Sequence, residues 1–220
     1  MPVINKSEVI RYLGGRGQKT DEGISADIDR LIAECEKIAV PRYVYKQFDI
    51  DDAFKIKNSD FTFLGEDIKK HLCGAKKVVV MAATIGFEIE KRTELYKHRC
   101  LKDSVLFDAC ATAYIESVCD ETEDEIRRQK KEEGLFLTTR FSPGYGDFPI
   151  TLQKDIISLT GADKRIGLTV TKSNILLPRK SVTAVMGITE NSLADKTGRC
   201  SCCSMANGCE FKKNGKQCIL

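Results

Sequence analysis

The sequence lacks the features that mark several large classes of protein. No stretch approaches the roughly 18 consecutive apolar residues that a membrane-spanning helix needs. Residues 1–6 contain no apolar segment of the secretory type, so we expect a cytoplasmic protein. The net charge is only +3, and no lysine and arginine run is interleaved with aromatic residues. We therefore expect neither a membrane nor a nucleic acid as partner.

Histidine is also scarce. The 220 residues include two, His71 and His98, and both fall in stretches of helical character, where we expect them on the surface. Nucleophilic catalysis commonly places a histidine beside a serine or cysteine, and we find no such nucleophile–base signature in the chain. The sequence thus indicates no acid–base or covalent catalyst.

Apolar residues and cysteines are plentiful. Apolar residues make up 42% of the chain, which is enough for one sizeable domain. Ten cysteines in a protein expected in the cytoplasm indicate metal or thiol chemistry rather than disulfides. Five of the ten lie within residues 200–220. We therefore divide the chain into a domain of residues 1–190 and a cysteine-rich C-terminal tail of residues 191–220.

The pattern of apolar residues predicts a mixture of helices and strands. Helices are expected at 7–13, 24–40, 66–73, 87–98, 103–131 and 151–159. Strands are expected at 42–50, 54–56, 61–64, 77–83, 135–141, 166–171 and 181–188. In the longest helix the first half is apolar and the second half is almost wholly charged, so we expect the second half to be a solvated extension. Thr84-Ile85-Gly86 joins a strand to a helix and is either a plain turn or a seat for an anion.

The stretch 140–147, Arg-Phe-Ser-Pro-Gly-Tyr-Gly-Asp, combines turn residues with polar ones. Its proline and glycines allow a sharp bend that a strand or helix would not adopt. Arg140, Tyr145 and Asp147 would meet within that bend, and a cation, an aromatic ring and a carboxylate suit a small, flat, charged ligand. The simpler interpretation is a tight turn whose polar residues are incidental, with Arg140 paired to the charged helix.

Arg140-x-x-x-Gly144-Tyr145, followed by a helical stretch and then Pro178-x-x-Ser181-Val182, resembles a known family. The pattern is similar to the S-adenosylmethionine-binding activation domain of cobalamin-dependent methionine synthase, above all to its free-standing form. The familiar motif is Arg-x-Ala-Pro-Gly-Tyr-Pro, and here Ser142 replaces the alanine and Gly146 the second proline. A weaker resemblance extends from about residue 7 to about residue 189.

The resemblance implies both a fold and an activity. The fold would be α+β, a twisted and mainly antiparallel sheet with flanking helices. The chain would bind S-adenosylmethionine and present its methyl group to the cobalt of a partner's cobalamin, which reductively reactivates methionine synthase or a related corrinoid methyltransferase. Its contribution would be positioning rather than acid–base chemistry, so the chain would be an activation subunit of a methyltransferase. An electron-donor protein would be a further partner.

The resemblance also suggests cofactor-binding residues. By position, Arg140 and the backbone at Ser142 would contact S-adenosylmethionine, and Tyr145 would face the corrin. Arg140 can bind a carboxylate with two parallel hydrogen bonds. Backbone groups near Gly144 would meet the ammonium group or the adenine. Either Asp147 or Glu116, the latter from the apolar half of the long helix, would complement the positive end of the ligand.

Four cysteines of the tail have a spacing that could hold a metal. Cys200, Cys203, Cys209 and Cys218 give Cys-x2-Cys-x5-Cys-x8-Cys, which could close a zinc site or hold an iron–sulfur cluster. The second pair is split too widely for a standard zinc finger. A tail of spare thiols is a further possibility. A second function therefore stands beside the first: a cysteine-cluster metal-binding or redox protein without S-adenosylmethionine chemistry.

Overall fold

The computed structural model of the chain describes residues 2–15 and 21–190. The chain separates into two compact units, each made of three segments. Unit 1 comprises Met1–Val44, Ala82–Thr122 and Gly161–Val182. Unit 2 comprises Tyr45–Met81, Glu123–Thr160 and, of the described residues that follow, 183–190. We describe each unit by itself.

The first two helices begin where a polar side chain caps their first amide groups. In unit 1, Asn5 caps α1 (Lys6–Tyr12) and Asp21 caps α2 (Glu22–Ile38), each by accepting from backbone N–H groups of the first turn. The remaining elements of unit 1 include α4 (Phe87–Arg99) and α7 (Ala162–Ile166). Unit 2 contains α3 (Glu66–His71), the 3-10 helix η1 (Ile150–Leu152) and α6 (Gln153–Thr160). The long helix α5 (Leu101–Glu132) supplies residues to both units.

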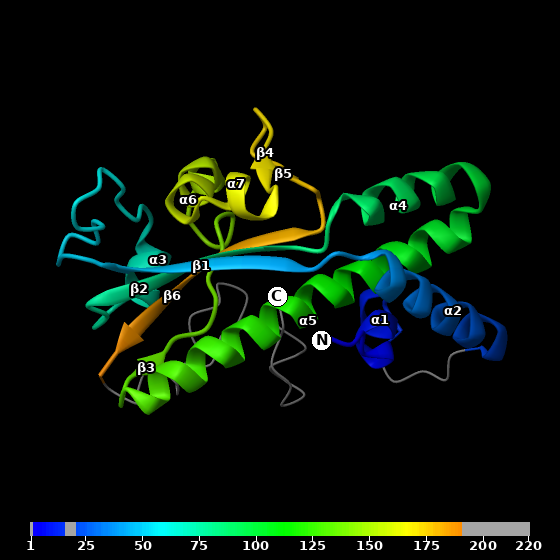
Figure 1. Ribbon diagram of the computed structural model, residues 1–220, viewed down its shortest axis with the longest axis horizontal. Helices are drawn as coiled ribbons and strands as arrows, with labels where there is room; N and C mark the ends of the chain where they lie inside the picture. The colour runs from blue at the N-terminus through cyan, green and yellow to red at the C-terminus, as the bar shows by residue number, and fades with distance from the viewer. Residues whose placement is uncertain (1, 16–20, 191–220) are drawn as a thin grey trace. The chain divides into compact units, whose positions relative to one another are not determined.

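The fold is α+β, with a four-stranded antiparallel sheet in the order β1-β2-β6-β3 (Figure 1). These strands are β1 (Arg42–Asp49), β2 (Lys77–Thr84), β3 (Phe136–Leu137) and β6 (Ser181–Thr189). In the β3–β6 pair, Phe136 lies opposite Thr189 and Leu137 opposite Ile188. A separate hairpin pairs β4 (Thr169–Val170) with β5 (Leu176–Leu177). The α+β fold class expected from the resemblance is confirmed.

The core of unit 2 contacts the 140–147 bend through Phe141 and through Phe148, the residue that follows the bend. It joins residues of β2 and β6 to residues of α3 and α6 and to the segment before α3. Its members are Ile50, Ile56, Phe61, Phe63, Ile68, Leu72, Ala75, Val78, Val80, Phe148, Ile156 and Val185. Phe148 directly follows the bend and is itself buried, so the bend is anchored in the core at that end.

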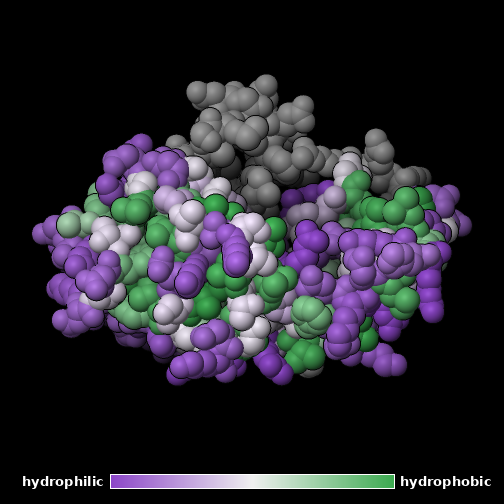
Figure 2. Space-filling model, turned by 90° about the horizontal axis from the view of Figure 1, so that it is seen from above, coloured by the Kyte–Doolittle hydropathy of each residue, from purple (hydrophilic) through white to green (hydrophobic). Residues whose placement is uncertain are grey.

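Unit 1 is held by apolar helix faces and by polar contacts at their edges. Ile28, Leu31 and Cys35 form the buried stripe of α2, as their helical spacing predicts. Glu34 on the same helix accepts from the hydroxyl of Tyr96 at 2.5 Å and pairs with Arg92 of α4. On the surface, charged and apolar residues are interspersed, as Figure 2 shows for the face it draws.

Several sequence-based expectations were wrong in detail. The segments 54–56 and 61–64 form isolated bridges rather than strands, and the expected strand at 135–141 is limited to β3 plus a bridge at Phe141. The expected strand at 166–171 is limited to the short β4, and Ile166 is the last residue of α7. The second half of α5 is not fully solvated, because Thr122, Glu123 and Ile126 are buried. No described helix is long and apolar enough to cross a membrane.

Candidate functional site

The bend at 140–147 is built by backbone hydrogen bonds. Phe141 enters it by pairing with Val185 of β6, each residue donating its N–H to the other's carbonyl at 2.9 Å. Within the bend, the N–H of Gly144 donates to the carbonyl of Phe148 at 2.8 Å, and the N–H of Tyr145 donates to the carbonyl of Ser142 at 3.1 Å. The bend is therefore a closed turn fixed to the sheet at one end, as expected from its proline and glycines.

Asp147 ties the bend to helix α3. Its Oδ2 accepts from the backbone N–H of Glu66 at 2.6 Å, and its Oδ1 accepts from that of Asp67 at 2.9 Å. These amide groups, Asp67 first and Glu66 second, hold the pKa of the Asp147 carboxyl below its usual value because they favour the charged form. Since both oxygens are engaged in this cap, the structure gives Asp147 a part in holding the bend.

Two glycines permit this close approach. Gly65, with φ +112°, is the N-cap residue of α3, and a Cβ there would come within 2.6 Å of Asp147 Oδ1. Gly146, with φ +51°, lies against the side chain of Asp67, which a Cβ would overlap. Both positions combine a left-handed backbone with no room for a side chain. The second proline of the familiar motif could not adopt the φ that Gly146 has here.

Arg140 lies at the root of the bend and is buried, with 8% of its surface exposed. Its Nε is 3.5 Å from Oε2 of Glu123, which is also buried on α5. The other oxygen of Glu123 accepts from Arg127 Nη2 at 2.8 Å, and Arg127 Nη1 donates to the carbonyl of Leu137 at 2.6 Å. The pairing of Arg140 with the charged helix, one of the two interpretations of the sequence, is present.

Pro143 is buried like Arg140, whereas three other residues of the bend are more accessible. Tyr145 is 41% exposed, and its ring meets the ring of Phe141 edge-on at a centroid distance of 6.2 Å. Ser142 is half-buried and Gly144 is exposed. The bend therefore offers a buried cation at its root and a partly exposed ring near its tip.

Glu116 belongs to unit 1, where it is half-buried on α5. Tyr12 of α1 lies close enough to respond to its charge: burial first, and then the Glu116 carboxylate, raise the pKa of the Tyr12 hydroxyl. The structure thus places Glu116 beside α1 and gives it an aromatic neighbour.

Two other sequence motifs have structural roles. Gly86 directly precedes α4 as expected, but Glu88 and Glu90 occupy the first turn of this helix, and their negative charge disfavours a bound anion. In the Pro178-x-x-Ser181 motif, the Ser181 hydroxyl donates to the carbonyl of Pro178 at 2.6 Å. This motif therefore closes the turn that precedes β6.

Two residues near the bend were not expected from the sequence. Glu123 was assigned to the solvated half of α5, although Thr122 and Ile126 continue the apolar spacing of Val118 and could have indicated burial.

His71, expected on the surface, is half-buried: its Nε2 lies 2.8 Å from the carbonyl oxygen of Thr139 and 2.9 Å from Thr138 Oγ1. Its ring packs on Phe141 at 5.0 Å. His71 thus supports the segment that leads into Arg140.

The cysteines proposed for a metal, Cys200, Cys203, Cys209 and Cys218, lie outside the described residues. Within residues 2–15 and 21–190, no three histidine, cysteine, aspartate or glutamate side chains are grouped so that they could hold a metal ion.

This chain resembles solved structures in fold. No protein-family model matches the chain. No curated protein matches it either. A solved structure described as the MetH reactivation domain bound to AdoHcy matches with a TM-score of 0.58, over 83% of this chain and 73% of that one. The chain has the fold of the MetH reactivation domain. At 16% identity, this likeness concerns the reactivation-domain fold alone.

Proposed function

We propose that this chain binds S-adenosylmethionine and presents its methyl group to the cobalt of a cobalamin carried by a partner protein. The observation that carries the proposal is the reactivation-domain fold combined with a buried arginine at the root of a glycine-hinged bend. The matching solved domain is described as bound to AdoHcy, the product that remains when S-adenosylmethionine has lost its methyl group. The partner would be a methionine synthase or a related corrinoid methyltransferase.

Arg140 is the residue proposed to bind the carboxylate of the ligand. Its planar guanidinium can donate two parallel hydrogen bonds to a carboxylate, and burial strengthens such a pair by excluding water. Glu123, 3.5 Å from Arg140 Nε, would hold the guanidinium in place before the ligand arrives. Because Arg127 also binds Glu123, that carboxylate keeps a cationic partner when Arg140 turns to the ligand.

The other proposed residues divide into contacts and supports. Backbone groups at Ser142 and Gly144 would meet the ammonium group or the adenine, and Tyr145, partly exposed, would face the corrin of the partner. Glu116 would complement the positive end of the ligand. Asp147 is the alternative that the sequence offered for that task, but its carboxylate caps α3, so we assign it to holding the bend.

The sulfonium group of the ligand supplies the reactive methyl, and the chain would supply its position. A methyl donor that is held in a fixed position beside the cobalt reacts within one complex, so no collision between free molecules is needed. A positioning protein lowers the activation barrier of the methyl transfer in this way. The electron for reduction would come from a separate donor protein.

Equilibrium binding of S-adenosylmethionine tests the proposal. We expect Arg140→Ala to weaken binding by at least about tenfold and Arg140→Lys to recover little, because lysine cannot form the paired hydrogen bonds. Arg165→Ala, which removes an exposed arginine of α7, serves as the control and should bind as the wild type does. Thermal midpoints with and without the ligand should agree with the affinities. Equal binding by wild type and Arg140→Ala would remove the site assignment.

The cysteine-rich tail is proposed separately as a metal site. The spacing of Cys200, Cys203, Cys209 and Cys218 supports four-thiolate binding of zinc or of an iron–sulfur cluster. Metal analysis and visible absorbance of anaerobically purified protein distinguish the two. Protein with neither zinc nor iron would refute the site while leaving ligand binding by the bend unaffected.

A further inference from the structure

Helix α3 contacts the chain at both ends of the bend. At the N-terminal end of the helix, the amide groups of Glu66 and Asp67 donate to the carboxylate of Asp147, the last residue of the bend. At the C-terminal end, His71 Nε2 lies 2.8 Å from the carbonyl oxygen of Thr139, the residue that precedes the bend. One helix of six residues therefore connects the beginning of the bend to its end.

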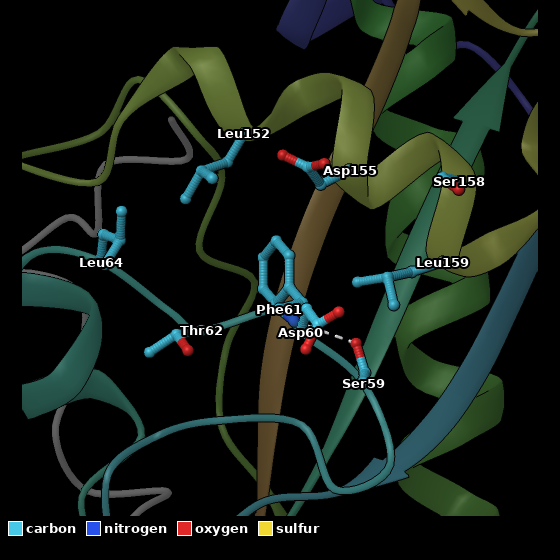
Figure 3. A pocket seen from close by; sticks show the side chains of 9 residues that line it. All are labelled: Ser59, Asp60, Phe61, Thr62, Leu64, Leu152, Asp155, Ser158 and Leu159. Carbon is cyan, nitrogen blue, oxygen red and sulfur yellow. Dashed lines mark hydrogen bonds between the residues drawn. The ribbon is translucent and has the colours of Figure 1, made fainter.

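Helix α3 is fixed in the core of unit 2. Ile68 of the helix and Leu72, which directly follows it, are fully buried members of that core. Phe61 belongs to the same core, and its ring, drawn in Figure 3, packs edge-on against Phe63 at a centroid distance of 4.9 Å. A helix that is seated in a close-packed core is a rigid support for the segments bound to its two ends.

The contact at His71 determines which ring nitrogen carries a hydrogen. The carbonyl oxygen of Thr139 can only accept, so Nε2 of His71 donates to it. The hydroxyl oxygen of Thr138 lies 2.9 Å from the same nitrogen and accepts from the N–H of Gly187 at 2.8 Å. His71 is thus connected to strand β6 as well as to the segment that leads into the bend.

This contact bears directly on the backbone of Arg140. The carbonyl of Thr139 belongs to the planar peptide unit that also contains the N–H of Arg140, so a bond to the carbonyl restricts rotation of that plane. On the other side of Arg140, Phe141 is paired with Val185 by two backbone hydrogen bonds of 2.9 Å. The side chain of Arg140 therefore extends from a backbone that is held on both sides.

We propose that His71 is a positioning residue for Arg140, and that α3 is a clamp which holds both ends of the bend in the geometry that binds the ligand. This inference rests on the proposed function, because it concerns how the S-adenosylmethionine site is held. His71 acts through the peptide unit between Thr139 and Arg140 and not by touching the ligand. A binding group that is fixed in advance loses less conformational freedom when the ligand arrives, so releasing the clamp lowers the affinity.

Two replacements of His71 separate its hydrogen bond from its shape. His71→Leu keeps an apolar side chain against Phe141 but cannot donate, whereas His71→Gln carries an N–H at a similar reach from the backbone. We expect His71→Leu to bind S-adenosylmethionine about fivefold more weakly than the wild type, which is the effect of losing one hydrogen bond. His71→Gln should recover most of this loss.

Ile56→Val is the control for a general loss of stability. It removes one methyl group from a buried side chain of the same core and should leave the affinity for S-adenosylmethionine unchanged. Thermal midpoints establish that each variant is folded at the temperature of the binding measurement. A change in affinity that occurs in His71→Leu and not in Ile56→Val then reports on the bend and not on the stability of the core.

A second measurement needs no ligand. The N–H of Phe141 donates to the carbonyl of Val185, so its hydrogen exchange reports how often the root of the bend opens. Relative to the amide groups of the buried strand β2, exchange at Phe141 should be several-fold faster in His71→Leu than in the wild type. It should be slow again in His71→Gln and unchanged in Ile56→Val.

A single clamp also predicts that its two contacts depend on each other. His71→Leu combined with Asp147→Asn should weaken binding by less than the product of the two separate effects, because the first change already releases the bend. Effects that multiply in full would refute a single clamp.

The remaining outcomes separate this proposal from the proposed function. Equal affinity in the wild type and His71→Leu, with Arg140→Ala still weaker, would refute the positioning role and leave the proposed function intact. Equal losses in His71→Leu and His71→Gln would show that the ring shape and not the hydrogen bond is responsible, which also refutes the proposal. A wild type that does not bind S-adenosylmethionine would refute the proposed function, and hydrogen exchange at Phe141 would still show whether His71 holds the bend.

Discussion

The carboxylate of Asp147 caps helix α3, although Asp147 lies 81 residues after Glu66 in the chain. Its Oδ2 accepts a hydrogen bond from the backbone N–H of Glu66 at 2.6 Å. Helix α3 begins at Glu66, and its N-cap residue, Gly65, has no side chain with which to cap it. Asp147 supplies the missing acceptor and in doing so fixes the end of the 140–147 bend. The geometry of the bend and the start of this helix therefore stabilise each other.

The first prediction concerns the pH dependence of this cap. The folded pKa of Asp147 lies below its usual value, so the charged cap stabilises the fold above the unfolded pKa, and this stabilisation is lost as the pH falls through the folded pKa. Asp147→Asn should lower the thermal midpoint at neutral pH and flatten its decline between about pH 5 and about pH 2. Asp163→Asn, at an exposed position in the first turn of α7, is the control. A decline as steep in Asp147→Asn as in the control would contradict the role of the cap.

The second prediction concerns the fit between the bend and α3. Gly146→Ala should destabilise the protein by more than the roughly 1–2 kcal/mol that a left-handed alanine costs, because its Cβ would overlap the side chain of Asp67. Asp67→Ala removes the overlapping atoms, so the double variant should recover part of the loss. A double-mutant cycle by chemical denaturation measures this coupling. Additive effects would show that the two residues do not meet.

Local patterns in the sequence predicted most of the helices and the central strands. The stripe of Ile28, Leu31 and Cys35 has helical spacing, and the unbroken apolar run that became β2 is typical of a buried strand. Short elements were less predictable. The segments 54–56 and 61–64 have strand composition, but each forms only isolated bridges with the rest of the chain. The number of paired residues depends on the folded neighbours of a segment, which its own composition does not reveal.

The candidate site was predictable in its location but not in its contacts. Proline and glycine marked the bend at 140–147, because those residue types restrict the backbone locally. The partners of Arg140 and Asp147 come from α5 and α3, and only the folded chain brings them close. Charge alone suggested that Asp147 faces the ligand, whereas the free amide groups of α3 compete for the same carboxylate and engage both of its oxygens.

The third prediction concerns the contact between α6 and β6. The hydroxyl of Thr183 donates to Gln153 Oε1 at 2.5 Å, and both residues are buried. Thr183→Val keeps the shape but leaves the glutamine oxygen without this donor, so we expect a loss of about 1–3 kcal/mol in the free energy of unfolding. Thr183→Ser keeps the donor and loses only one methyl group, at about 0.8 kcal/mol.

Replacing both partners supplies the control for this hydrogen bond. Thr183→Val with Gln153→Leu removes the polar atoms together and should be more stable than Thr183→Val alone. Urea denaturation of the four proteins measures the differences. If serine at position 183 were as costly as valine, then the side-chain shape and not the hydrogen bond would be responsible.

The last prediction concerns the thiols of unit 1, and it bears on which cysteines are available to bind a metal. Burial raises the pKa of the Cys110 thiol to about 12, and burial likewise raises the pKa of Cys35. At pH 8 a thiol with that pKa is ionised in only about one molecule in 10,000, and the thiolate is the reactive form. In the native protein, iodoacetamide should therefore modify the exposed Cys73 and leave Cys35 and Cys110 unmodified, as read by mass spectrometry of the separate peptides.

In guanidinium chloride, where the chain is unfolded, all three cysteines should react with iodoacetamide at similar rates. Native modification of Cys35 or Cys110 at the rate of Cys73 would mean that the core between α2 and α5 opens far more readily than its packing implies.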